Sequence, residues 1–165
     1  MKTITFVRHA KSLWSNNFSN DHARALSDKG KDDAHKAAHI FNTKRIKIDL
    51  IITSSAIRAI NTAEIFSSVI KYPIDEIIIN KSLYLADQYM IINELKMQDK
   101  LKDNIMIFGH NPGFTNLVNC FLGNKSIIDL TTSAIITFDL SLDLWINIKA
   151  CKKSLTFTTE ESYYL

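Results

Sequence analysis

The sequence contains few of the residues that mark several common protein classes. Its 165 residues include two cysteines, two prolines and four glycines. Cys120 and Cys151 lack paired ligand spacing, so we expect two reduced thiols rather than a disulfide or a metal site. The turn after the first expected strand has no Gly-x-Gly-x-x-Gly pattern, which argues against a dinucleotide-binding sheet.

Long apolar runs and clusters of one charge are also missing. No stretch approaches the roughly 18 apolar residues that a membrane span needs, and the first residues lack the apolar core of a signal peptide. We therefore expect no membrane association and a cytoplasmic location. The net charge of +3 comes from lysines spread along the chain, so we expect a solvated surface and no nucleic-acid partner.

The residues that are present favour one globular α/β domain over residues 1–165. The chain is 46% apolar and 22% charged, and its length is typical of one domain. Short β-rich runs alternate with segments of helical periodicity, and this alternation predicts a parallel core sheet. Strands are expected at 3–8, 50–52, 77–79 and 104–108, and helices at 27–42, 56–70, 87–100 and after Pro112.

The C-terminal part has a different pattern. Residues 133–139 and 144–149 are expected to be strands, and a short polar segment at 140–143 joins them. Two such strands predict an antiparallel hairpin at the edge of the sheet.

Two of the expected parallel strands end at a histidine. Residues 3–7 run into Arg8-His9, and residues 105–108 run into Gly109-His110. Ligands of open α/β sheets bind outside the carboxyl ends of the strands. The sequence therefore predicts one pocket that contains both histidines.

A third segment adds an arginine to this pocket. The expected strand at 50–52 is followed by Thr53 and by Ser54-Ser55, a pair suited to helix capping, and then by a helix with Arg58 in its first turn. A helix N-terminus and a guanidinium together favour an oxyanion such as phosphate. His9 between cationic groups would stay neutral and could attack phosphorus.

These segments together resemble the histidine phosphatase superfamily, and specifically its small branch of SixA-like phosphohistidine phosphatases. The matching segments are Arg8-His9-Ala10-Lys11-Ser12, Asp21 to Leu26, Ser54 to Ala63, Gly109 to Gly113 and Thr131 to Ile135. The resemblance implies a three-layer α/β/α sandwich with a mostly parallel central sheet. It also implies that His9 is the nucleophile, that Arg8, Arg58 and His110 bind the phosphoryl group, and that neither a metal nor another cofactor takes part.

The proton donor is the least defined part of the expected site. Many members of the wider superfamily carry a glutamate just after the third strand, but residues 80–87 contain none. In the resemblance to SixA-like proteins, Asp21 is a candidate acid or base, and a loop-bonding aspartate is the alternative. A phosphohistidine substrate would reduce the need for an acid, because water or a neighbouring histidine can protonate its imidazole leaving group.

Several other polar or aromatic residues are assigned structural roles. Asn111 is expected to bond its own turn before Pro112. His35 and His39 lie four residues apart on an expected helix, where a solvated face is favoured over a metal site. Trp14 and Trp145 are expected to be packing residues.

The length leaves little room for insertions that would enclose a small metabolite, so we expect a shallow pocket. Such a pocket favours phosphohistidine on a protein, for example a histidine phosphotransfer domain. Two alternatives remain open: a phosphatase for small phosphoesters, and a catalytically weak module that binds phosphate or a partner protein.

Overall fold

The computed structural model describes residues 1–13, 18–123 and 129–159. Trp14, one of the expected packing residues, lies outside these ranges. The described chain forms a six-stranded sheet in the order β3-β2-β4-β1-β5-β6. Its strands are β1 Lys2–Arg8, β2 Leu50–Ser54, β3 Ile78–Asn80, β4 Asn104–Gly109, β5 Ile135–Leu140 and β6 Lys153–Thr158.

The sheet is mostly parallel, as the alternation of the sequence predicts. β1 pairs with β4, β4 with β2, and β2 with β3, all in parallel. β5 pairs antiparallel with β1, and β6 pairs antiparallel with β5 at the edge. The predicted α/β fold with an antiparallel pair of edge strands is therefore confirmed.

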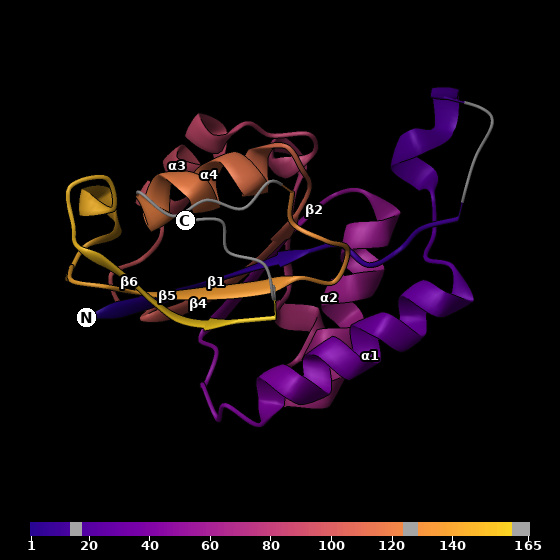
Figure 1. Cartoon of the computed structure of the whole chain (residues 1–165), viewed down its shortest axis with the longest axis horizontal. Helices are drawn as coiled ribbons and strands as arrows, with labels where there is room; N and C mark the ends of the chain where they lie inside the picture. Colours follow the sequence, from indigo (N-terminus) through magenta and orange to yellow (C-terminus); the bar gives the residue numbers. More distant parts are fainter. Residues whose placement is uncertain (14–17, 124–128, 160–165) are drawn as a thin grey trace.

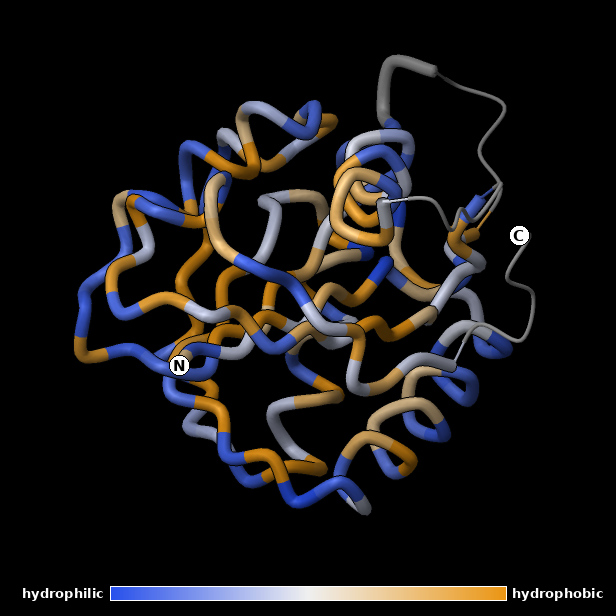
Figure 2. Tube along the Cα trace, turned by 60° about the vertical axis from the view of Figure 1, so that its left-hand side comes forward, coloured by the Kyte–Doolittle hydropathy of each residue, from blue (hydrophilic) through white to orange (hydrophobic). Residues whose placement is uncertain are grey.

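Helices cover both faces of the sheet. α1 (Asp28–Asn42) and α2 (Ile57–Ile70) lie on one face, and α3 (Gln88–Lys96) and α4 (Gly113–Leu122) lie on the other (Figure 1). Each pair of helices packs on its own cluster of buried apolar side chains. Hydrophobic residues follow the central strands in Figure 2, which is the pattern of a sheet buried on both faces. The arrangement is the expected three-layer sandwich.

The start of α1 follows the sequence prediction closely. Ser27 is its N-cap, and the Ser27 hydroxyl accepts a hydrogen bond from the Gly30 amide at 3.0 Å. A side chain at Gly30 would place its Cβ 1.9 Å from the Lys11 carbonyl oxygen. The lack of a side chain here lets the helix begin directly against the segment that follows β1.

The predicted strand at 144–149 is wrong. Trp145–Asn147 form a short 3-10 helix, and the last strand is Lys153–Thr158. Trp145 and Ile148 are buried and lie three residues apart, a helical spacing, while Leu144 and Ile146 are exposed. The Trp145 indole also donates a hydrogen bond to the Lys102 carbonyl at 2.7 Å. Its packing role is as expected.

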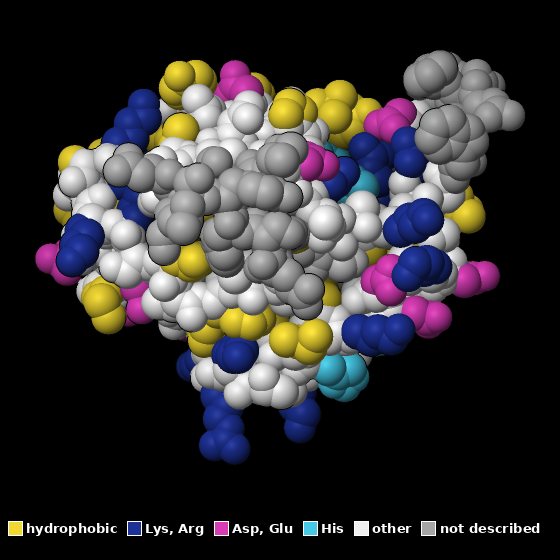
Figure 3. Space-filling view, in the orientation of Figure 1, with side chains coloured by type: hydrophobic (Ala, Val, Ile, Leu, Met, Phe, Trp, Pro, Cys, Tyr) yellow, Lys and Arg dark blue, Asp and Glu magenta, His cyan; other side chains and the backbone are white. Residues whose placement is uncertain are grey.

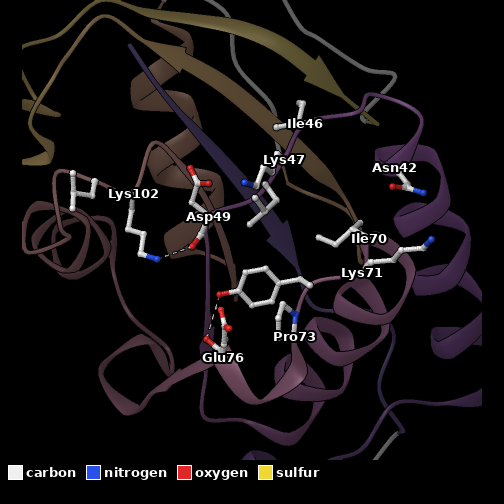
Figure 4. A pocket seen from close by; sticks show the side chains of 12 residues that line it. Asn42, Ile46, Lys47, Asp49, Ile70, Lys71, Pro73, Glu76 and Lys102 are labelled. Carbon is white, nitrogen blue, oxygen red and sulfur yellow. Dashed lines mark hydrogen bonds between the residues drawn. The ribbon is translucent and has the colours of Figure 1, made fainter.

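A cavity of about 390 Å³ lies at the opposite end of the sheet from the strand ends that carry the histidines (Figure 4). Tyr72 lies in it, and lysines and carboxylates line its rim. None of the predicted site residues lines this cavity. None of the helices in the described ranges has the length and apolar content that a membrane crossing requires.

Candidate active site

The parallel strands bring the predicted site residues to one edge of the sheet. β1 lies beside β4 with Arg8 opposite Gly109, so His9 and His110 leave the sheet next to each other. Their ring centroids are 5.1 Å apart. Arg58, in the first turn of α2, contacts both rings. The structure therefore brings His9, His110 and Arg58 together.

Hydrogen bonds define the orientation of the His9 ring. Its Nδ1 lies 2.8 Å from the Ala10 carbonyl oxygen, which can only accept, so Nδ1 carries the proton. Its Nε2 accepts a hydrogen bond from Arg58 Nε at 3.2 Å. The neutral ring thus presents the lone pair of Nε2 to the arginine.

His9 is neutral at physiological pH. The pKa of His9 is lowered to about 4. Burial is the largest cause, the charges of Arg58, Arg8 and Arg24 act in the same direction, and the hydrogen bond to Ala10 acts in the opposite one. A neutral imidazole has a free nitrogen lone pair, which a nucleophile requires.

Arg58 uses its two edges for different partners. Nε and Nη2 face His9 Nε2 at 3.2 Å and His110 Nδ1 at 3.5 Å. Nη1 and Nη2 donate to the carbonyl and carboxylate oxygens of Asp21 at 2.6 and 3.0 Å. The side chain is only 5% exposed. One edge of the buried guanidinium is therefore held by Asp21, and the other edge faces both histidines.

Ser54 fixes His110 from the opposite side. His110 Nε2 lies 2.7 Å from the Ser54 hydroxyl, and because Nδ1 accepts from Arg58, Nε2 is the donor. The pKa of His110 is lowered to about 3, first by burial and then by the neighbouring His9 and Arg58. The predicted capping role of the serine pair is wrong, because Ala56 is the N-cap of α2 and makes no side-chain cap bond. Ser55 instead bonds His22 at 2.9 Å.

Arg8 lies beside the two histidines and lowers the pKa of both. Its guanidinium donates to the Leu130 carbonyl and forms an ion pair with Asp129 at 3.3 Å. Its buried Nε has no hydrogen-bond partner among the described residues. Arg8 is thus held at the edge of the site with one donor still unused.

Asp21 accepts three hydrogen bonds on its carboxylate. The donors are Arg24 Nη1 at 2.8 Å, Arg58 Nη2 at 3.0 Å and the Tyr84 hydroxyl at 2.8 Å. Burial alone would raise the pKa of Asp21, but the hydrogen bond from Tyr84 and the charge and hydrogen bonds of the two arginines lower it. The carboxyl group is therefore ionised at neutral pH.

Tyr84 is a site residue that the sequence analysis missed. It lies in the segment after β3, and its ring packs edge-on against His110 at 5.7 Å and His22 at 4.8 Å. Burial raises the pKa of Tyr84, and its bond to the Asp21 carboxylate raises it further. Its position after a parallel strand was the available signal, since β3 ends at the same sheet edge.

Asn111 is expected to bond its own turn, but its side chain bonds a different segment. Its amide donates to the Asp129 carboxylate at 2.6 Å and to the Leu130 carbonyl at 3.0 Å. Asp129 and Leu130 are also the partners of Arg8. Asn111 therefore ties the segment after β4 to the segment that holds Arg8, and the prediction of a local turn is wrong.

Potential metal ligands do not gather in the described part of the chain. Within residues 1–13, 18–123 and 129–159, no group of three or more histidine, cysteine, aspartate or glutamate side chains could hold an ion. His35 and His39 are both exposed on α1.

The sequence of this chain is similar to one protein family. Residues 4–81 match the family model described as histidine phosphatase superfamily (branch 1). No curated protein matches the sequence. A candidate phosphohistidine phosphatase SixA from Agrobacterium tumefaciens has a similar structure, with a TM-score of 0.81 and 20% identity over 96% of this chain and 97% of that one.

Two further solved structures have the same fold. The protein histidine phosphatase SixA complexed with tungstate aligns with a TM-score of 0.77 and 18% identity over 94% of this chain and 95% of that one. A mycobacterial glucosyl-3-phosphoglycerate phosphatase aligns with a TM-score of 0.68 and 12% identity over 95% and 98% of the two chains. The family match and the fold agree, and the similarity of this chain to the histidine phosphatase superfamily is confirmed.

Proposed function

We propose that this protein is a metal-independent phosphatase that passes a phosphoryl group through His9. The match of residues 4–81 supports a phosphatase as the general function. The observation that carries the proposal is the position of Arg58, whose Nε and Nη2 edge faces nitrogen atoms of both histidines. Such an edge binds two oxygens of a phosphoryl group at once.

His9 is the nucleophile in this proposal. Its Nε2 lone pair attacks phosphorus as the bond from phosphorus to the leaving group breaks, and a phosphohistidine forms on Nε2. Water then attacks the phosphorus, which releases inorganic phosphate and returns the lone pair to Nε2. The Nδ1 bond to Ala10 keeps the ring in the tautomer that both steps need.

Arg58, Arg8 and His110 stabilise the phosphoryl oxygens. The Arg58 edge would exchange its bonds to the histidines for bonds to phosphoryl oxygens, and its bonds to Asp21 would keep it in place. Arg8 supplies positive charge and an unused buried Nε donor. Preorganised donors of this kind lower the energy of a phosphoryl-transfer transition state.

We assign Asp21 a positioning role in place of proton donation. An ionised carboxylate with three donors has no proton to give. Tyr84 is also a poor acid, because burial and Asp21 raise its pKa. A site with this chemistry fits a leaving group that solvent can protonate, such as the imidazole of phosphohistidine. We therefore propose phosphohistidine on a protein, such as a histidine phosphotransfer domain, as the substrate.

A phosphatase for small metabolites is the second candidate. Its support is the fold similarity to the glucosyl-3-phosphoglycerate phosphatase. Steady-state rates with phosphohistidine peptides, sugar phosphates and nucleotides separate the two candidates, because alkyl phosphate esters release an alkoxide that needs a proton. Faster turnover of the alkyl esters would favour the second candidate.

A labelling experiment tests the covalent step. A phosphohistidine peptide carrying ³²P is mixed with the protein and quenched in alkaline detergent, in which phosphohistidine is stable. We expect label on the wild-type protein and on His39→Ala, the matched exposed histidine, and none on His9→Ala. Tight phosphate binding without label or turnover would instead indicate a binding module and overturn the proposal.

A further inference from the structure

Leu85 combines two unfavourable features, an exposed apolar side chain and a strained backbone, and its contacts within this chain do not explain either of them. Its side chain is 60% exposed. Its φ of 51° lies in the left-handed region, which glycine adopts readily but which is sterically unfavourable for a bulky residue such as leucine. A strained backbone and an exposed leucine at the same position point to a role outside the folding of the chain.

The neighbours of Leu85 hold it at the site. Leu83 and Ala86 are buried in the core. The Tyr84 hydroxyl donates a hydrogen bond to the Asp21 carboxylate. Gly113 packs so closely on Ala86 that a Cβ added to Gly113 would lie 2.0 Å from the Ala86 carbonyl oxygen. The backbone on both sides of Leu85 is therefore fixed, and its side chain remains exposed beside Tyr84.

Two other exposed apolar residues come from the same sheet edge. Leu13 follows β1 and is 53% exposed, and Ile57 begins α2 after β2 and is 36% exposed. The Leu13 carbonyl accepts a hydrogen bond from Arg24, the partner of Asp21, and Ile57 precedes Arg58. In Figure 3, hydrophobic side chains lie directly beside the place where histidine and basic side chains reach the surface together.

We propose that Leu13, Ile57 and Leu85 form a docking rim that receives apolar side chains flanking the phosphorylated residue of a protein substrate. This inference rests on the proposed function. The basic centre takes the phosphoryl group, and the rim covers its apolar neighbours when the two surfaces meet. A sugar phosphate carries no apolar group next to its phosphate, so the rim fits a polypeptide.

Two synthetic peptides test the rim. Both carry one central phosphohistidine, flanked on each side by leucines in the first peptide and by serines in the second. We expect the wild-type protein to hydrolyse the leucine peptide with a kcat/KM roughly tenfold higher, the size of effect that a few apolar contacts produce. The ratio of the two kcat/KM values is the readout.

Leu85→Asn is the informative variant, because asparagine tolerates the left-handed backbone and removes the apolar side chain. We expect it to reduce the ratio toward one, and a Leu13→Ser, Leu85→Asn double variant to abolish the preference. The matched control is Leu101→Asn, since Leu101 is 76% exposed and lines the cavity at the opposite end of the sheet. This control keeps the wild-type ratio.

Two results would overturn the rim in different ways. Equal hydrolysis of both peptides by the wild-type protein would be consistent with the proposed phosphatase activity but would contradict the docking rim. An unchanged ratio in the double variant does the same. If the protein hydrolyses neither peptide, in contrast, the proposal that phosphohistidine is the substrate is contradicted, and the proposal of a substrate-docking rim is contradicted with it.

Discussion

At the scale of single residues, each histidine of the site is held by a different hydrogen bond. His9 Nδ1 bonds a carbonyl of its own strand end, whereas His110 Nε2 bonds the hydroxyl of Ser54 from the neighbouring strand. Both bonds leave the other ring nitrogen facing Arg58. The two rings therefore present free nitrogens to the same guanidinium edge.

Replacing Ser54 by alanine tests the role of its hydroxyl. Without it, His110 loses its Nε2 partner and the orientation of its ring, and we expect kcat/KM to fall about fivefold to tenfold for the loss of one buried hydrogen bond. Ser54→Thr keeps a hydroxyl and should restore most of the activity. A purely structural role would lower the free energy of unfolding in Ser54→Ala but leave kcat/KM of the folded protein unchanged.

The protonation of His9 is a second prediction at this scale. Burial and three arginines lower its pKa to about 4, so the ring should stay neutral as the pH falls from 8 to 5. The chemical shift of its Cε1 proton, followed by NMR across this range, measures this directly. His9→Asn identifies the resonance. A midpoint near the ordinary histidine value of about 6.5 would contradict the prediction.

The residues that the sequence analysis missed share a physical cause. Tyr84 and Ser54 take part through the direction of their side chains, and those directions depend on contacts between segments distant in sequence. Ser54 lies 56 residues from His110 and Tyr84 lies 63 residues from Asp21. In contrast, Arg8, His9 and His110 lie at strand ends, and the parallel sheet alone brings such positions together.

At the scale of elements, the short 3-10 helix Phe18–Ala23 connects the loop after β1 to α2. Its residue Asp21 bonds Arg58 through both a backbone and a carboxylate oxygen, and bonds Arg24 of its own loop. This helix thus links the loop that follows His9 to Arg58, which faces His9.

Asp21→Asn tests whether this element positions the site or supplies a proton. The amide keeps the shape but not the charge that compensates Arg58, and we expect kcat/KM to fall about 100-fold from misplacement of the guanidinium. Because a positioning residue serves all substrates, the loss should be equal for aryl phosphates with good and poor leaving groups. A larger loss for poor leaving groups would instead identify Asp21 as the general acid.

The predictability of the elements follows from their burial. The central strands β1, β2 and β4 follow a clear pattern, because strands buried on both faces read as apolar runs. The start of α1 is equally clear, because Ser27 caps the helix in the expected way. The edge strand Lys153–Thr158 has no buried residue and no alternation of burial. The mainly apolar segment 144–148 has the composition of a strand, but Trp145 and Ile148 are the residues that are buried in the core.

At the scale of the whole molecule, the site makes stability depend on pH. His9 and His110 are neutral in the folded protein, with pKa values of about 4 and about 3, while in the unfolded chain histidines bind protons below about pH 6.5. The unfolded state therefore gains protons first as the pH falls. The stability present above pH 6.5 is lost progressively toward pH 4.

Thermal unfolding followed by circular dichroism measures this loss. We expect the midpoint to fall by roughly 5–10 °C between pH 6.5 and pH 5, since each neutral buried histidine contributes in the same direction. The lowered pKa values of Asp21 and Asp103 act only at more acidic pH, below the ordinary aspartate value. A His9→Gln, His110→Gln variant should lose most of the dependence between pH 6.5 and pH 5. An equally steep fall in that variant would mean that other groups cause it, and that the two histidines are not held neutral by the fold.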